Sequence, residues 1–220
     1  MAASKKKKEQ EVINLPESFH VFSADLSLRC PGFCVMTIIN KEIVDIKTSF
    51  VNNRNTKLTD HGELLNKIGK AMTENIPNND LPIFFVREKA FNARASMSEI
   101  GIYKVIGIVD WINWGLRQES SSYSNWYEVF PVTVKKLITG SGKADKLEVQ
   151  QALENYVGKR EYTVDDESDS VAVALAFLIQ NNLMASKPLD KYAPKQTKTN
   201  DNVSKMNVME NEISKEEKGE

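Results

Sequence analysis

The sequence has little cysteine and no long apolar run, and these two absences exclude several classes of protein. Cys30 and Cys34 are its only cysteines, too few for a disulfide framework. They do not form a CxxC pair, and no second pair or nearby histidine completes a zinc site, so we interpret both as reduced core residues. No uncharged apolar run reaches 18 residues, and the N-terminus begins with lysines rather than an apolar segment. We expect no membrane span, no secretory signal and a cytoplasmic protein.

Charge is also nearly balanced over the whole chain. The 220 residues carry 29 Lys and Arg against 30 Asp and Glu, for a net charge of -1. Bulk charge therefore gives no support to nucleic-acid binding, and any such site must be a local patch. The 41% of hydrophobic residues is enough for one ordinary globular core.

That apolar material lies in the middle of the chain. Residues 1–16 contain a run of four lysines, and residues 186–220 are rich in Lys, Asn, Glu and Ser. Segments of this composition bury too little apolar surface to offset the loss of conformational entropy on ordering. We therefore expect one domain at 17–185 between a disordered basic N-terminal tail and a disordered charged C-terminal tail. The tetralysine is either an arm that seeks phosphates or a plain solubility tail.

Hydrophobic periodicity within 17–185 predicts an α/β domain with a mixed sheet. Apolar alternation over 19–50, broken at Pro31-Gly32 and Asn40-Lys41, predicts a three-strand antiparallel meander. An amphipathic helix follows from Thr59, a candidate N-cap, to about residue 75. The other expected elements are a strand at 81–86 covered on both faces, a helix at 95–116, a strand at 127–134, a helix at 144–157 with Leu147 facing inward, and a helix at 167–182.

Four acidic residues stand where acids are costly. Asp25 interrupts an apolar strand, and Glu88 follows a buried strand at the carboxyl edge of the sheet, where ligands bind in open α/β folds. Asp166 and Asp169 are three residues apart and share one face of the last helix. Carboxylates brought together repel one another unless cations bind, and a cluster of oxygen ligands suits Mg²⁺ or Mn²⁺.

Three of the four acids also have a simpler interpretation when taken alone, whereas Asp169 precedes the apolar face of its helix and is less easily explained in this way. Asp166, like its neighbours, could cap the helix, Asp25 could form a turn, and Glu88 could pair with Arg87 or Lys89. The loop at 140–143 fails the Walker pattern, so we expect no nucleotide cofactor. It could present free N–H groups to a DNA phosphate, or be a simple strand-to-helix turn.

Five segments, in order, resemble the RuvC family of Holliday junction resolvases. They are FSADLSLRCPGFCVM, VREKAF, EIGIYKVIGIVDWINW, FPVTVKKLITGSGKADKLEVQQAL and DDESDSVAVALAFL. The likeness runs from about residue 19 to residue 183 and leaves only the tails outside, and a phage-type member is one possibility. CPGFC and the tryptophans Trp111 and Trp114 have no counterpart that we can assign in the family pattern.

The resemblance implies a ribonuclease H-like fold with a site for two divalent ions, Mg²⁺ or Mn²⁺, about 3.5–4 Å apart. It implies that the catalytic and metal-binding residues are Asp25, Glu88, Asp166 and Asp169. It also implies five DNA-binding residues. Phe91 would probe bases at the branch point, and four lysines would contact phosphates: Lys135, Lys136, Lys143 and Lys146.

The function implied is that of a crossover junction endodeoxyribonuclease that leaves 5′-phosphate and 3′-hydroxyl ends. Its expected partners are four-way junctions, and also forks and flaps, with a second copy of the chain in a homodimer. Its expected location is the cytoplasm of a bacterial cell or of a phage-infected host. Two alternatives are a noncatalytic branched-DNA-binding protein on the same fold and a relative of the actin-like and sugar-kinase ATPases.

Overall fold

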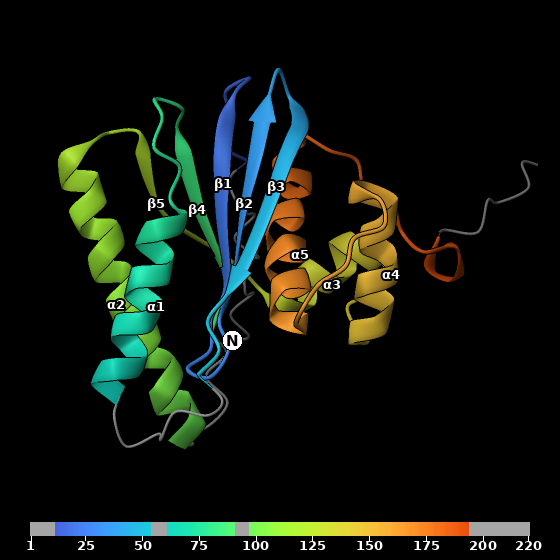
Figure 1. Ribbon diagram of the computed structural model, residues 1–220. Helices are drawn as coiled ribbons and strands as arrows, with labels where there is room; N and C mark the ends of the chain where they lie inside the picture. The colour runs from blue at the N-terminus through green and yellow to red at the C-terminus, as the bar shows by residue number, and fades with distance from the viewer. Residues whose placement is uncertain (1–11, 54–60, 91–96, 194–220) are drawn as a thin grey trace, which may run out of the picture.

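The computed structural model describes residues 12–53, 61–90 and 97–193, which form a five-stranded sheet with helices on both faces (Figure 1). Its strands are β1 (Phe19–Asp25), β2 (Gly32–Ile39), β3 (Glu42–Phe50), β4 (Ile83–Glu88) and β5 (Tyr123–Val129). Its helices are α1 (His61–Asn75), α2 (Met97–Glu119), α3 (Pro131–Thr139), α4 (Lys146–Val157) and α5 (Asp165–Gln180), with a short 3₁₀ turn, η1 (Asp190–Tyr192).

The sheet is mixed, as the sequence predicts. Its strand order is β3-β2-β1-β4-β5. β1, β2 and β3 pair antiparallel as a meander, whereas β4 pairs parallel with both β1 and β5. Parallel strands need crossover connections, and α1 and α2 supply the two that lead to β4 and β5. The expected α/β fold class is confirmed.

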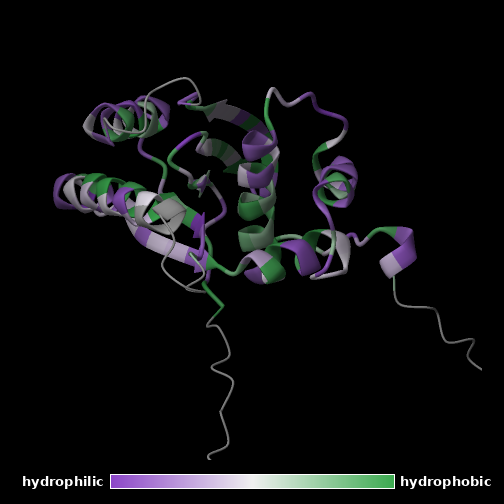
Figure 2. Ribbon diagram, turned by 90° about the horizontal axis from the view of Figure 1, so that it is seen from below, coloured by the Kyte–Doolittle hydropathy of each residue, from purple (hydrophilic) through white to green (hydrophobic). Residues whose placement is uncertain are grey.

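Two hydrophobic clusters fill the space between the sheet and its helices. Successive strand residues point to opposite faces, so Phe22 and Phe85 pack toward α1 and α2, whereas Val21 and Val86 pack toward α5. The two groups of helices lie on opposite sides of the sheet in both ribbon views, and α1 and α2 show alternating hydrophobic and hydrophilic bands (Figures 1 and 2). This alternation is typical of helices that cover a sheet on one side and face water on the other.

Helix α5 is the central helix of its layer. Every residue from Ser170 to Ile179 is at most 8% exposed. It packs against β1 and β2 and is itself covered by α3 and α4. Its alanines at 172, 174 and 176 are buried on different sides of the helix, because neighbouring elements surround α5.

The prediction of a strand at 127–134 is wrong in its second half. β5 ends at Val129, and Pro131 begins the additional helix α3 at a position where its missing N–H and fixed φ favour a helix start. α3 ends at Gly140, whose φ is +90° and whose N–H donates to the carbonyl oxygen of Lys136. The loop at 140–143 therefore joins two helices rather than a strand and a helix, and Lys135 and Lys136 lie on α3.

Other boundaries also differ from expectation. Leu147 is 62% exposed rather than inward, because Val149, Ala152 and Leu153 make up the buried face of α4. The described residues 12–16 and 186–193 contact the domain through Ile13, Leu15 and Leu189, so these contacts extend beyond the expected limits at 17 and 185. The rest of both tails, and the candidate N-cap Thr59, lie outside the described residues.

The longest described helix, α2, does not have the character of a membrane span. In the part of the chain that the structure describes, no helix combines the length and the apolar character needed to cross a bilayer.

Candidate active site

Two of the four predicted acids lie side by side at the carboxyl edge of the sheet. Asp25 is the last residue of β1 and Glu88 the last residue of β4. The residues that precede them, Ala24 and Arg87, are paired in the parallel register of these strands. The edge is thus the one at which open α/β folds place their ligands.

The other two acids come from the start of α5. Asp166 and Asp169 lie in its first two turns, and the charges of both raise the pKa of Asp25, so the helix brings them close to the strand end. Glu167, between them, is buried and accepts hydrogen bonds from the Thr48 hydroxyl at 3.0 Å and from the Thr163 N–H at 2.7 Å. This anchored side chain holds the first turn of α5 against β3.

Burial and mutual repulsion make three of these carboxylates, those of Asp25, Glu88 and Asp169, hard to ionise. Burial raises the pKa of Asp25 to about 8, and the charges of Glu88, Asp169 and Asp166 add to the effect. Burial, with the charge of Asp169, raises the pKa of Glu88 to about 7. The pKa of Asp169 is also raised, chiefly by burial, although the ammonium of Lys146 opposes the shift. A cluster of this kind favours the binding of a cation.

Positive charge reaches the same place from α3 and α4. A cavity of about 160 Å³ is lined by residues that include Glu88, Lys135, Lys146 and Asp169. The Lys146 ammonium lies 3.3 Å from the Asp169 carboxylate and 3.8 Å from Asp165. The Lys135 ammonium donates to the carbonyl oxygen of Ala144 at 2.7 Å. Carboxylates and lysines from four separate elements, β4, α3, α4 and α5, thus meet in one pocket.

The remaining predicted DNA-binding residues do not line this pocket. Lys136 and Lys143 are exposed on α3 and on the loop that follows it. Phe91 lies outside the described residues.

The simpler interpretation of Glu88 as a strand-end ion pair does not fit the contacts of its neighbours. Arg87 pairs with Asp110 at 2.5 Å and with Glu128 at 3.1 Å, and Lys89 pairs with Glu128 at 3.4 Å. Both neighbouring cations therefore bind other carboxylates. Arg87 ties β4 to α2 and β5 on the far side of the sheet from the acidic pocket.

The pocket has the donor chemistry of a divalent-metal site, because its carboxylate oxygens repel one another and attract a cation. The Lys146 ammonium already occupies the position of such a cation beside Asp169. As the side chains lie, however, no three of the His, Cys, Asp or Glu residues among the described residues converge on a single point. The acids are near enough to interact electrostatically, which the raised pKa values of Asp25 and Glu88 reflect, but Lys146 takes the place beside Asp169. The four carboxylates are thus suitable ligands for a divalent ion, but their side chains are not arranged around a common point in this structure.

Sequence reasoning missed two residues that support this site. Gln150 of α4 donates to Asp165 at 3.2 Å and to the Ser168 hydroxyl at 3.3 Å, which joins α4 to the start of α5. Glu148 forms a capping box with Asp145 at the start of α4, and the D-x-x-E spacing is the signal that could have found it. No local signal points to Gln150.

Comparison with known proteins agrees with this geometry. A family model described as Crossover junction endodeoxyribonuclease RuvC matches residues 21–177. A protein of that name from Pseudothermotoga lettingae is 24% identical over 164 residues, which cover 74% of this chain and 96% of the relative. One from Caldicellulosiruptor saccharolyticus is 37% identical over 57 residues, 26% of this chain and 34% of the relative.

Solved structures of Thermus thermophilus RuvC have the same fold. The structure described as T. thermophilus RuvC in complex with Holliday junction substrate has a TM-score of 0.56 and 19% identity, and the match covers 78% of this chain and 99% of that one. A second Thermus thermophilus RuvC structure has a TM-score of 0.54. The mixed sheet with its flanking helices is thus the ribonuclease H-like fold of these proteins.

The fold and the matching family place the protein in the class of junction-cleaving endonucleases. The chain belongs to the RuvC family of crossover junction endodeoxyribonucleases, because the family model spans most of its length. Enzymes of this family resolve Holliday junctions and depend on a divalent metal ion.

Proposed function

We propose that the acidic pocket is the active site at which this chain hydrolyses phosphodiester bonds of Holliday junctions. The observation that carries the proposal is the meeting of Asp25, Glu88 and Asp169 from three elements, each with a raised pKa, beside Lys146. A protein without catalysis gains nothing from such a repelling cluster. The products would carry 5′-phosphate and 3′-hydroxyl ends.

Asp25, Glu88, Asp166 and Asp169 would hold two divalent ions, Mg²⁺ or Mn²⁺, through carboxylate oxygens. Two such ions, when bound, activate a water and stabilise the leaving 3′ oxygen. The carboxylates would have to turn toward common points, and Asp169 would have to release the Lys146 ammonium. Lys146 is then free to face the scissile phosphate, where its charge opposes the negative charge that develops during attack.

The other cations would bind the DNA backbone around the pocket. Lys135 lines the pocket, whereas Lys136 and Lys143 are exposed on the adjoining helix and loop, where they would contact phosphates further along the strand. Phe91 stays a prediction as the residue that probes bases at the branch point.

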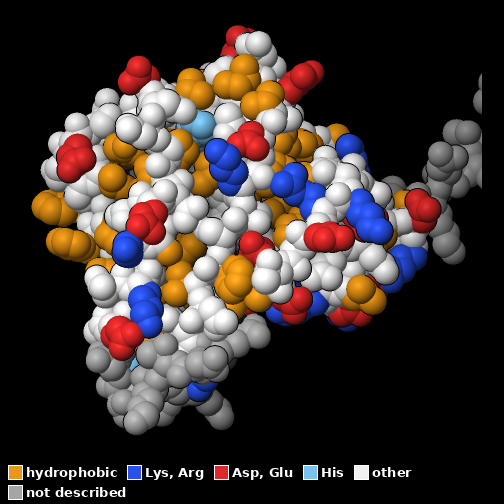
Figure 3. Space-filling model, viewed as in Figure 1, with side chains coloured by type: hydrophobic (Ala, Val, Ile, Leu, Met, Phe, Trp, Pro, Cys, Tyr) orange, Lys and Arg blue, Asp and Glu red, His pale blue; other side chains and the backbone are white. Residues whose placement is uncertain are grey.

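A homodimer would present two such sites to the two strands of a junction, since a twofold axis matches two symmetric nicks. Helix α2 offers the surface for it: Trp111 is 67% exposed, Trp114 56% and Tyr103 48%. Hydrophobic side chains stand out at the edge of the molecule over α2 (Figure 3). Replacing Trp111 and Trp114 by glutamate would convert the dimer to a monomer in sedimentation velocity; an unchanged dimer would move the interface elsewhere.

Forks and flaps are further substrates in this proposal, and access to such DNA would place the enzyme in the cytoplasm of a bacterial or phage-infected cell.

A noncatalytic branched-DNA-binding protein is the second candidate, and the retained acids count against it. An actin-like or sugar-kinase ATPase needs two domains of this fold and a second phosphate loop, whereas this chain has one sheet in its described part.

The test of the site compares Asp25→Asn with a matched change on the surface, Asp45→Asn, in a residue of β3 whose side chain is 49% exposed. Asp25→Asn should abolish cleavage of a labelled four-way junction in Mg²⁺ while junction binding persists. Asp45→Asn should leave both unchanged. Full cleavage by Asp25→Asn would remove the pocket from catalysis, and binding without cleavage by the wild-type chain would favour the noncatalytic alternative.

A further inference from the structure

The chain continues past α5 and crosses back over the pair of helices α3 and α4. Residues 186–192, which we call the C-terminal strap, include the 3₁₀ turn η1. The family model ends at residue 177, so the strap lies outside the part of the chain that this model matches. Its contacts reach both helices and the loop that joins them.

The first set of contacts fixes the end of α3. The Ser186 hydroxyl donates to the carbonyl oxygen of Leu137 at 2.6 Å, and the Leu189 N–H donates to the carbonyl oxygen of Thr139 at 3.0 Å. A Cβ atom on Gly140 would lie 2.8 Å from Cβ of Pro188 and 2.9 Å from Cβ of Tyr192. The strap thus closes over a glycine whose positive φ already ends the helix, and the fit leaves no room for a side chain.

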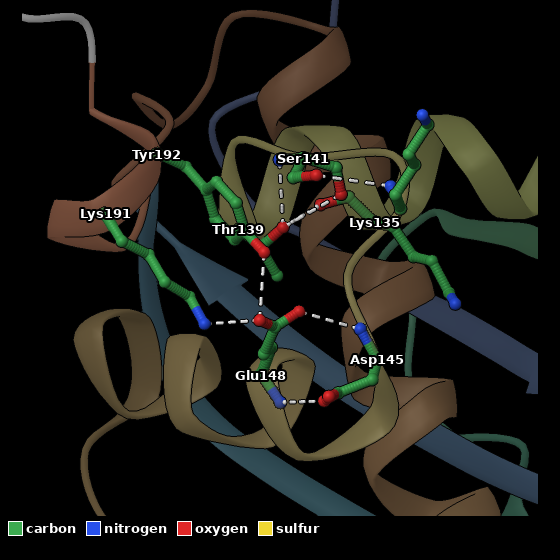
Figure 4. Close-up of polar contacts among 8 residues, drawn as sticks. Lys135, Thr139, Ser141, Asp145, Glu148, Lys191 and Tyr192 are labelled. Atoms are coloured by element: carbon green, nitrogen blue, oxygen red, sulfur yellow. Dashed lines mark hydrogen bonds and ion pairs between the residues drawn. The ribbon is translucent and has the colours of Figure 1, made fainter.

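The second set of contacts fixes the start of α4 through Glu148 (Figure 4). The Tyr192 hydroxyl donates to Oε1 of Glu148 at 2.9 Å, and the Lys191 ammonium forms an ion pair with the same oxygen. The hydrogen bond from Lys191 is the chief reason that the pKa of Glu148 falls to about 2. The Glu148 side chain is only 16% exposed between these partners, so its carboxylate stays charged and fixed in place.

Glu148 also holds the first turn of its own helix. Its Oε2 accepts from the Asp145 N–H at 2.8 Å, while Oδ1 of Asp145 accepts from the Glu148 N–H at 2.9 Å (Figure 4). Lys146 lies between the two residues of this capping box, and its ammonium meets Asp169 in the acidic pocket. One carboxylate therefore connects the strap to the turn that carries Lys146.

We propose that the C-terminal strap holds the α3–α4 pair in its working position, and that Glu148 and Tyr192 are positioning residues for Lys146. The inference deepens the proposed function and rests on it, because it assigns a purpose to the strap only if Lys146 serves cleavage. A lysine displaced by about 1 Å from a reacting phosphate loses much of its effect on the rate. The strap prevents that displacement through its contacts with Glu148 and with the end of α3.

The test uses the full chain with Leu189→Ala and Tyr192→Ala combined, which loosen the strap without changing its charge. Val44→Ala, on β3 at a residue 58% exposed, is the matched control. Single-turnover cleavage of a four-way junction in Mg²⁺ should fall about tenfold in the strap variant and stay at the wild-type rate in the control. Tyr192→Phe, which removes only the hydroxyl, should show a smaller loss of the same kind and serves if the double variant does not fold.

A double-mutant cycle separates positioning from general stability. In a Lys146→Ala background the strap variant should cause almost no further loss, because the residue that the strap positions is already gone. A full tenfold loss in that background, or no loss in the wild-type background, would overturn the inference.

Hydrogen exchange gives a readout that does not need activity. The amides of Glu148 and Val149, which donate to Oδ1 and to the carbonyl oxygen of Asp145, should exchange at least about fivefold faster in the strap variant, and unchanged exchange would contradict the strap's role. If the wild-type chain fails to cleave junctions, the proposed function fails, and the exchange result still decides whether the strap holds α4.

Discussion

Gly32 of β2 and Asp166 of α5 are in backbone contact. A Cβ atom added to Gly32 would lie 2.0 Å from the carbonyl oxygen of Asp166, closer than any real Cβ contact. Gly32 is also the register partner of Asp25 across β1 and β2. The absence of a side chain at this one position therefore lets the start of α5 reach the strand that carries Asp25, and brings Asp166 and Asp169 beside it.

Gly32→Ala should accordingly separate α5 from the sheet beside the acidic pocket. We expect a loss of about 1–3 kcal/mol in the free energy of unfolding, because the backbone of α5 must move to avoid the methyl group. Cleavage should fall further than the loss of folded protein explains, since Asp166 and Asp169 move with the helix. Urea unfolding and single-turnover cleavage measure the two effects.

Gly107→Ala is the matched control for that change. Gly107 lies on an exposed part of α2, and a Cβ atom there would meet nothing within 4 Å. This variant should be as stable as the wild type or slightly more so. Wild-type stability and activity in Gly32→Ala would contradict the close approach of α5.

The metal-free protein should lose stability as the pH rises from 5 to 8. The pKa values of Asp25 and Glu88 are raised to about 8 and about 7, so the folded state holds protons that the unfolded state has released above pH 4–5. Stability from these groups is therefore present at low pH and is lost as the pH approaches the folded pKa values, by at least about 1 kcal/mol. Thermal melts in EDTA at several pH values measure it.

Asp25→Asn is the control for the pH effect, because its side chain does not ionise. The slope between pH 5 and pH 8 should flatten in this variant, and its metal-free form should be no less stable than the wild type at pH 8. Mg²⁺ or Mn²⁺ should raise the melting temperature of the wild type at pH 8 and have less effect on the variant. A melting curve indifferent to both pH and divalent ions would contradict the carboxylate cluster.

His20 should give the opposite pH dependence. Its ring is 3% exposed, lies between Thr37 at 3.1 Å and Asn79 at 3.0 Å, and burial lowers its pKa. The unfolded state takes up a proton near pH 6.5 that the folded state resists, so stability is lost as the pH falls below that value. Because Glu88 also titrates in this range, the effect of His20 is the difference between the melts of Asp25→Asn with and without His20→Gln from pH 7 to pH 5. An equal slope with and without His20 would contradict the assignment.

Much of the fold follows from local patterns, which is why the sequence predicts it. Alternation over β1 to β3, with a turn at Asn40-Lys41, predicts the meander, although the first connection spans 26–31 and Gly32 already belongs to β2. The short apolar segment before Glu88 predicts a strand buried on both faces. The end of β5 was mispredicted because the β-branched residues from Val132 to Val134 favour a strand, whereas Pro131 and the later burial of Val134 and Ile138 support a helix.

The four acids could be singled out from the sequence for a similar reason, since each stands in an apolar or helix-start context, and their role in catalysis stays a prediction. Their partners were not, because they depend on contacts between distant segments. Lys146 and Asp169 lie 23 positions apart in the chain and meet only after α4 packs on α5. Glu148 and Tyr192, 44 positions apart, meet only after the chain has returned across α3 and α4.

The lysines of the pocket should contribute to junction affinity in a salt-dependent way. Each lysine that neutralises a phosphate releases counterions, so Lys146→Ala should weaken binding and lower the slope of log K against log salt by about 1. Lys70→Ala, on α1 with a side chain 71% exposed and away from the pocket, should change neither. Filter binding in Mg²⁺ from 50 to 300 mM salt, a range of about sixfold, measures the slope, with Asp25→Asn present in every protein compared so that the junction is not cut. An unchanged slope in Lys146→Ala would remove this residue from the DNA contacts.

The most direct measurement is incubation of the purified chain with a labelled four-way junction and a linear duplex of matched sequence, in Mg²⁺ and in EDTA. The account predicts paired, symmetric nicks in the junction alone, only with Mg²⁺, leaving ends that ligase can rejoin because they carry 5′-phosphate and 3′-hydroxyl groups. Equal cutting of the duplex, or cleavage that persists in EDTA, would contradict the assignment of the acidic pocket as a metal-dependent, junction-resolving site.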